Sequence, residues 1–136
     1  MKLYKVLSAS LLTCTVLVLS TQSQAEQFTE ADVKRWTGEY MVVMKQGDKL
    51  FHGGLKAKNT VSCDQCHPNA TNIHPETYPK FQQQLGKVAL LGEMINWCIM
   101  NPTESDPLAL DSDEMVALQA YIHYERRGKP LQPGNH

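Results

Sequence analysis

The sequence predicts an all-α fold in a single domain, and three observations support this prediction. Apolar residues recur at the three- and four-residue spacing of an α-helix in three separate segments. Capping residues, prolines and glycines separate these segments. No stretch alternates polar and apolar residues well enough to predict a β-strand.

The first 25 residues have the pattern of a secretory signal peptide. Lys2 and Lys5 form a basic start, residues 6–19 form an apolar run, and the small residues before the predicted cut fit the rule for cleavage after Ala25. The apolar run is shorter than the roughly 20 residues that a membrane-spanning helix needs. We therefore expect an exported, periplasmic domain over residues 26–136 with no membrane span.

The size and charge of this domain limit its partners. Removing 25 of the 136 residues leaves 111, which is enough for one modest hydrophobic core. The cut also removes two of 13 basic residues and none of 14 acidic ones, so the formal net charge becomes −3. Because the only basic cluster is Arg126-Arg127, the composition argues against nucleic acid as a partner.

The first helix is predicted over residues 27–44. Thr29 is a suitable N-cap, and acidic residues follow it in the first turn, where they complement the helix dipole. Gly47-Asp48 is expected to end the helix. The predicted apolar stripe consists of Val33, Trp36, Tyr40, Val43 and Met44.

The middle of the chain is predicted to be mostly irregular. Residues 52–60 are rich in turn formers, and residues 68–79 are polar with three prolines, which indicates an ordered loop. A short helix is expected over residues 78–86. A longer helix is expected over residues 88–100, ended by Asn101-Pro102. One side of this helix carries Leu91, Met94, Ile95 and Cys98.

The last helix is predicted after a loop over residues 103–110, and it extends to about Arg127. Asp111 and Glu114 stand at capping-box spacing, and Gly128 is a typical helix terminator. Residues 129–136 are expected to form a loose tail. The residues predicted to face inward are Met115, Leu118, Tyr121 and Ile122.

Cys63-Asp64-Gln65-Cys66-His67 forms the motif C-x-x-C-H, the attachment signature of c-type haem. Two thiols at this spacing add to the two vinyl groups of the porphyrin, and the adjacent His67 supplies the proximal imidazole. One covalent haem c is therefore predicted, bound by Cys63, Cys66 and His67. The alternatives are a zinc site, a thioredoxin-like redox pair and a plain disulfide.

The second axial ligand decides the function, and spacing alone leaves it open. Cys98 is the odd thiol, 31 residues past His67 on an apolar helix face, but a buried cysteine also serves as a small hydrophobe. Met94 on the same face, Met100 before the turn and His74 are rivals, and His123 is a weaker one. The full set of candidates is Met41, Met44, Met94, Met100, Met115, His52, His74, His123, His136 and Cys98.

Several segments in order resemble the SoxA family, the haem c subunits of the periplasmic thiosulfate-oxidising complex, to which the thiosulfate dehydrogenases are related. The similarity covers roughly residues 50–131. The resemblance implies a class I cytochrome c-like helical domain with Cys98 as axial ligand and a low reduction potential. It is carried by VSCDQCH at residues 61–67, YPKF at 78–81, INWC at 95–98, ALQAYI at 117–122 and RGKP at 127–130.

The sequence also departs from this family. Family enzymes usually carry an arginine directly after the axial cysteine, where this chain has Ile99, and many relatives contain two haem domains. The small His/Cys-ligated cytochromes called NaxLS are a nearer analogue in size. They are paired single-haem subunits thought to handle electrons or small gases.

We therefore predict an exported monohaem cytochrome with His67 and Cys98 as ligands of the iron. Its expected role is low-potential electron transfer with a redox partner protein, as a homodimer or a heterodimer with another small cytochrome c, rather than catalysis. A displaceable distal ligand would also allow binding of NO or CO. The alternatives are a SoxA-like enzyme of thiosulfate or sulfite oxidation and an ordinary His/Met electron carrier.

Overall fold

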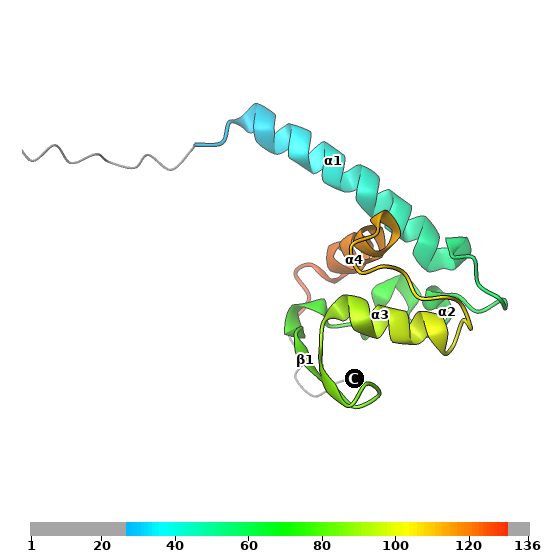
Figure 1. The fold of residues 1–136 in the computed structure, drawn as a ribbon. Coiled ribbons are helices and arrows are strands. Elements are labelled where there is room, and N and C mark those ends of the chain that lie inside the picture. Colours follow the sequence, from blue (N-terminus) through cyan, green and yellow to red (C-terminus); the bar gives the residue numbers. More distant parts are fainter. Residues whose placement is uncertain (1–26, 131–136) are drawn as a thin grey trace, which may run out of the picture.

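The computed structural model describes residues 27–130. The predicted signal peptide and residues 131–136 of the predicted tail lie outside this range. Three helices form the body: α1 (Glu30–Lys49), α3 (Leu91–Met100) and α4 (Asp113–Arg126) (Figure 1). The shorter elements are η1 (Leu50–Gly54), α2 (Cys63–Cys66), η2 (Pro68–Ala70), η3 (Pro75–Thr77), β1 (Lys80–Gln82) and β2 (Lys87–Ala89).

Helix α1 has the predicted N-cap, Thr29, but it begins at Glu30 rather than at residue 27 and ends later than predicted. The Thr29 backbone N–H donates to the Asp32 carboxylate (3.1 Å), and the Asp32 N–H donates to the Thr29 hydroxyl oxygen (3.2 Å), which completes a capping box. The predicted stop at Gly47-Asp48 is wrong, because the helix continues to Lys49. Gly47 instead permits a close crossing with α4, since a Cβ atom there would overlap the carbonyl oxygen of Ala117.

The apolar stripe of α1 is buried only in the second half of the helix. Met44 lies in the core, whereas Val33 is 53% exposed and Trp36 is 39% exposed. The Tyr40 hydroxyl donates to the carbonyl of Ala120 on α4 (2.9 Å). The part of the helix that precedes Tyr40 extends away from the body of the protein (Figure 1). The prediction of one continuous buried stripe is therefore wrong for the first two turns.

Helix α4 is the central core element, and its inward face is as predicted. The capping box predicted at Asp111 and Glu114 is wrong: the N-cap is Ser112, whose hydroxyl accepts from the Met115 N–H (3.2 Å). Gly128 follows the helix end at a φ of 67°, a conformation that favours glycine. All four residues predicted to face inward, Met115, Leu118, Tyr121 and Ile122, are buried.

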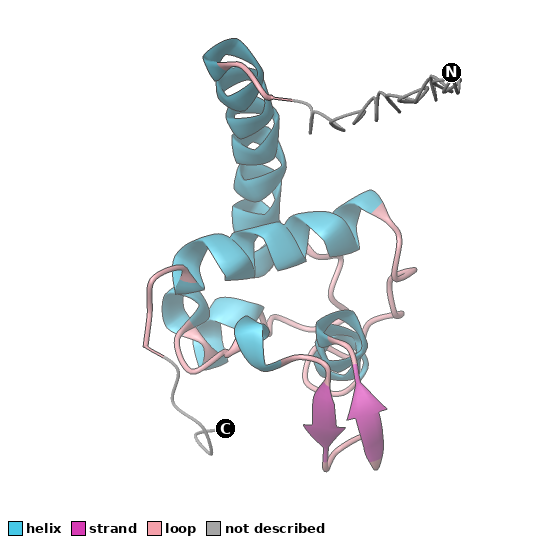
Figure 2. Cartoon of the chain, turned by 90° about the vertical axis from the view of Figure 1, so that its left-hand side faces the viewer, coloured by secondary structure: helices cyan, strands magenta, loops and turns pink. Residues whose placement is uncertain are grey.

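A short β-hairpin replaces the helix predicted over residues 78–86. Strands β1 and β2 pair antiparallel with Phe81 opposite Val88, and Gly86 turns the chain at a φ of 65° (Figure 2). The pattern was missed because a strand of three residues is too short to show a clear alternation. Strand β2 also takes the start of the predicted helix over residues 88–100, so α3 begins at Leu91, where the Glu93 carboxylate accepts from the Leu90 N–H (2.8 Å).

The all-α prediction is thus correct for the body of the domain and incomplete at the hairpin. The predicted loop over residues 68–79 contains only two single turns, η2 and η3. Over the range that the structure describes, no helix is long and apolar enough to cross a membrane.

Candidate functional site

A cavity of about 350 Å³ lies between α2, the hairpin, α3 and α4. This volume is within the range of small-molecule and cofactor pockets, roughly 300–1,000 Å³. Its walls are mainly apolar, and they bring together segments that lie far apart in the sequence. The lining includes Phe51, Cys63, Cys66, His67, His74, Tyr78, Leu91, Met94, Ile95, Trp97, Cys98 and Ile122.

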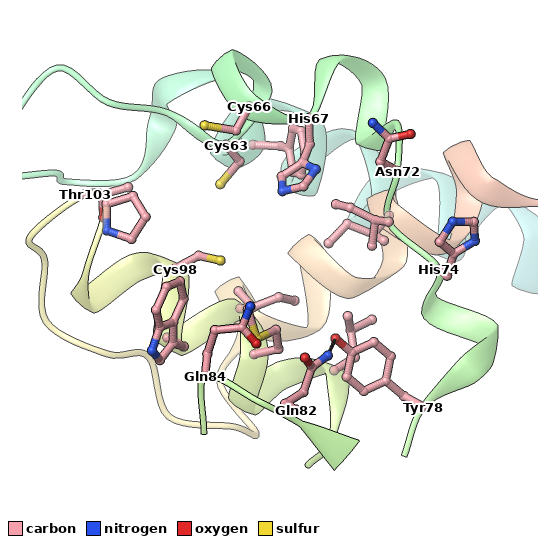
Figure 3. A pocket seen from close by; sticks show the side chains of 18 of the residues that line it. Cys63, Cys66, His67, Asn72, His74, Tyr78, Gln82, Gln84, Cys98 and Thr103 are labelled. Atoms are coloured by element: carbon pink, nitrogen blue, oxygen red, sulfur yellow. Dashed lines mark hydrogen bonds between the residues drawn. The ribbon is translucent and has the colours of Figure 1, made fainter. Parts of the chain in front are cut away.

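Helix α2 brings the C-x-x-C-H residues to one end of this cavity. Its single turn is closed by the His67 backbone N–H, which donates to the Cys63 carbonyl (3.0 Å). One helical turn therefore places both thiols beside each other, with the imidazole of the next residue close by. Figure 3 shows Cys63, Cys66 and His67 grouped above the cavity. The predicted attachment residues thus line a single pocket.

The imidazole of His67 is oriented by the chain that follows it. Its Nδ1 lies 3.0 Å from the carbonyl oxygen of Thr71. A carbonyl can only accept, so Nδ1 carries the proton and Nε2 keeps a free lone pair, the form that binds a metal. The carbonyl reaches the ring because the backbone turns sharply through left-handed conformations at Asn69, Ala70 and Asn72 (φ 49°, 56° and 63°).

Cys98 faces the same cavity from α3, across from the C-x-x-C-H residues (Figure 3). The predicted helix side is confirmed, since Leu91, Met94, Ile95 and Cys98 all line the cavity. On the other side of α3, the buried Asn96 amide donates to the Leu108 carbonyl (2.8 Å) and accepts from the Leu108 N–H (2.9 Å). These bonds hold α3, and with it Cys98, against the loop that follows.

Two of the thiols that line this cavity, those of Cys63 and Cys98, have raised pKa values. Burial raises the pKa of Cys63 to about 11, and the neighbouring Cys98, Asp64 and Cys66 act in the same direction. Burial also raises the pKa of Cys98, with a further contribution from Cys66. A buried thiol becomes a thiolate only where a positive charge replaces the lost hydration. A metal cation in the cavity would supply that charge.

The rival ligands are distributed unequally. Met94 and His74 line the cavity with Cys98. Met100 is 45% exposed, His123 is on the surface, and Met115 is fully buried in the core. His52 borders a separate polar groove and pairs with Asp48, with 3.0 Å between Nδ1 and Oδ1. His136 lies beyond residue 130. The distal candidates that the structure brings to the cavity are therefore Cys98, Met94 and His74.

Three cavity residues come from the hairpin and were not predicted. Lys80, Gln82 and Gln84 line the wall opposite α2, and the Gln82 amide donates to the Tyr78 hydroxyl (Figure 3). They were missed because the segment was assigned to a helix. A hairpin could have been predicted from Gly86, which lies between two short segments. Each segment carries one large apolar residue, Phe81 in the first and Val88 in the second.

Comparison with known proteins decides the family. The model of the SoxA/TsdA cytochrome c domain matches residues 46–131, which is more than half of the chain. The chain belongs to this family. A cytochrome c domain implies covalently bound haem c, and the C-x-x-C-H motif and Cys98 all lie within the matched residues.

Two relatives are similar over part of their length. A thiosulfate dehydrogenase from Psychrobacter arcticus is 26% identical over 81 residues, which covers 54% of this chain and 25% of that protein. The crystal structure of SoxXA from P. pantotrophus matches with a TM-score of 0.62 at 20% identity, covering 73% of this chain and 39% of that chain. The chain therefore shares the fold of the matched part of SoxXA, and it spans less than half the length of either relative.

The residues of the cavity fit a haem. Two adjacent thiols provide the thioether linkages, and an imidazole with its Nε2 lone pair free provides a ligand for iron. Leu91, Ile95, Phe51 and Ile122 give the apolar surroundings that a porphyrin needs. A sulfur atom on the facing helix completes a donor set suited to iron.

Proposed function

We propose that this chain is an exported monohaem c-type cytochrome with His67 and Cys98 as axial ligands, acting in low-potential electron transfer. One observation carries the proposal: His67 and Cys98 line the same cavity from different elements, beside the two attachment cysteines. When bound, the haem iron supplies a one-electron couple.

The protein residues have separate roles in this proposal. Cys63 and Cys66 hold the porphyrin edge, and the Thr71 carbonyl keeps the His67 ring in one tautomer and orientation. The Cys98 thiolate stabilises ferric iron more than ferrous iron, because its negative charge compensates the additional positive charge. The reduction potential is therefore low. The apolar walls exclude water and strengthen this charge interaction.

The proposed partners follow from the family, and the proposed location follows from residues 1–25. A redox partner protein supplies and accepts the electron, and a second small cytochrome c, as a homodimer or heterodimer, is the expected assembly. The signal pattern of residues 1–25 supports export to the periplasm.

Displacement of Cys98 on reduction would open the distal position to NO or CO. Gas binding is tested by adding CO to the ferrous protein, which should shift the Soret band of the haem.

A potentiometric titration of matched variants tests the ligand assignment. Cys98→Met replaces a thiolate by a neutral thioether, so the midpoint potential should rise by on the order of 0.1 V or more. Met94→Leu is the control, because Met94 lies one turn away on the same cavity wall. It should leave the potential nearly unchanged. A large change in Met94→Leu with none in Cys98→Met would identify an ordinary His/Met carrier.

A second function, sulfur oxidation, is favoured by the relative named thiosulfate dehydrogenase. In that case Cys98 would bind iron and contact the sulfur substrate. Ile99 occupies the position after Cys98, and its side chain is buried in the core rather than charged. Thiosulfate or sulfite should therefore not reduce the purified ferric protein. Reduction at a rate above that of a Cys98→Ser variant would instead support the enzyme.

A further inference from the structure

His74 is a buried polar residue that the proposed electron-transfer function does not use. It is 5% exposed and lines the cavity. Figure 3 places it at the far end of the cavity from Cys63 and Cys66, beyond Asn72. A buried histidine facing a cofactor cavity needs partners for both ring nitrogens.

The segment around His74 fixes the ring and supplies one of these partners. The His74 carbonyl accepts from the Thr77 hydroxyl (2.7 Å) and the Thr77 N–H (3.1 Å), which closes the turn η3. The ring Nδ1 lies 3.2 Å from the Glu76 carboxylate oxygen Oε1. Because this carboxylate accepts a hydrogen bond, Nδ1 carries a proton, and Nε2 remains for a second partner.

The chemistry of haem attachment indicates what that partner is. The two vinyl groups of the porphyrin lie on one edge, and the two propionates lie on the opposite edge. Thioethers at Cys63 and Cys66 would therefore leave the propionates toward the end of the cavity where His74, Tyr78 and Gln82 lie. A buried carboxylate in an apolar pocket needs hydrogen-bond donors or a positive charge.

We propose that His74 donates a hydrogen bond from Nε2 to a haem propionate while Glu76 holds Nδ1. We further propose that protonation of this ring is coupled to reduction of the iron. The inference rests on the proposed haem attachment. One electron comes from the redox partner and one proton from water, and the proton binds His74. The imidazolium favours the ferrous state because its positive charge attracts the added electron.

Other ionisable groups lie on the elements that pack near His74. Glu76 is on the same turn, with its carboxylate oxygen 3.2 Å from Nδ1. Lys80 and Tyr78 lie along the cavity wall. Helix α4, which contacts η3, carries ionisable residues in its last two turns. These groups are His123, Tyr124, Glu125 and Arg126.

The test is the midpoint potential of the holoprotein between pH 5 and 8, the range in which histidines titrate. Covalent haem is first established by its retention on a denaturing gel, so a failure of haem attachment is distinguished from a failure of this inference. In the wild type, the equilibrium constant for reduction should fall about tenfold as the pH rises, which equals 59 mV for one electron.

Two variants and one control separate the propionate contact from a structural role. His74→Gln keeps an amide N–H donor without a titrating ring, so the protein should keep its haem and lose the pH slope. Glu76→Gln removes the carboxylate that accepts from Nδ1, so the pH range of the slope should differ from that of the wild type. His52→Gln, which alters a histidine–carboxylate pair outside the cavity, should keep the wild-type slope. A wild-type slope in His74→Gln would overturn the proposal.

Discussion

Tyr121 illustrates how one buried side chain makes the stability of this domain depend on pH. Its ring packs on Phe51 with 5.0 Å between ring centroids. Burial raises the pKa of Tyr121 to about 12, and the carboxylates of Glu125, Asp48 and Asp64 act in the same direction. An unfolded tyrosine titrates near 10. Between these two values the unfolded chain loses its proton more readily than the folded protein, so unfolding becomes more favourable.

The Tyr121→Phe variant tests this at the residue scale. Phenylalanine keeps the aromatic contact with Phe51 and removes the ionisable hydroxyl. The stabilising effect of the tyrosine proton is fully present below pH 10 and is lost as the pH rises toward 12. The variant should therefore lose less free energy of unfolding than the wild type between pH 10 and 12. Urea titrations at pH 7, 10 and 11 measure this difference, and equal losses in the two proteins would show that Tyr121 does not contribute.

At the residue scale, the site was predictable where its residues are neighbours in the sequence. The C-x-x-C-H motif needs only one helical turn to bring Cys63, Cys66 and His67 together, so its spacing was informative. The prediction of Cys98 as the second axial ligand required the resemblance to a family, because spacing alone left Met94 and Met100 as rivals. The Thr71 carbonyl that orients His67 was not predictable, since its position depends on left-handed backbone at three nearby residues, Asn69, Ala70 and Asn72.

At the scale of secondary-structure elements, α1 and α4 cross at close range. Glycine at position 47 lets the two backbones approach more closely than any side chain would allow. The sequence alone made this glycine look like a helix stop, because a close helix crossing is a tertiary contact with no local signal. The apolar stripes of α3 and α4 were predictable because each faces one core.

Two alanine substitutions in α1 distinguish the crossing from simple helix propensity. Gly47→Ala places a Cβ atom on the Ala117 carbonyl, so the free energy of unfolding should fall by about 2–3 kcal/mol. Gly38→Ala is the matched control, because no atom lies within 4 Å of its added Cβ. It should raise the free energy of unfolding by about 0.5–1 kcal/mol. If chemical denaturation gave a similar increase in the free energy of unfolding for both variants, the close crossing at Gly47 would not contribute to stability.

At the scale of the whole molecule, the cavity is the feature that organises the fold. Segments from α2 to α4 surround it, while the first half of α1 extends away from the body (Figures 1 and 2). The sequence predicted which helices contribute to the core but not the hairpin that forms one wall. Strands of three residues pair through contacts that no single segment reveals. A cofactor in this space would complete the small core of this domain.

The length of the relatives bears on function at this scale. The chain spans a quarter of the thiosulfate dehydrogenase and 39% of the SoxXA chain that it matches. Fold and family are shared, but the activity of a longer protein depends on parts that the matched region does not include. For this reason the function proposed above, single-haem electron transfer, is limited to what the residues of this domain could perform.

Low-temperature electron paramagnetic resonance of the purified ferric holoprotein tests whether His67 and Cys98 bind the haem iron. His67 and Cys98 as axial ligands predict a low-spin signal with the narrow g-spread of thiolate ligation, and Cys98→Met should replace it with a wide one. A wide g-spread in the wild-type protein, of the His/Met or His/His kind, would contradict the account and return Cys98 to the role of a core residue.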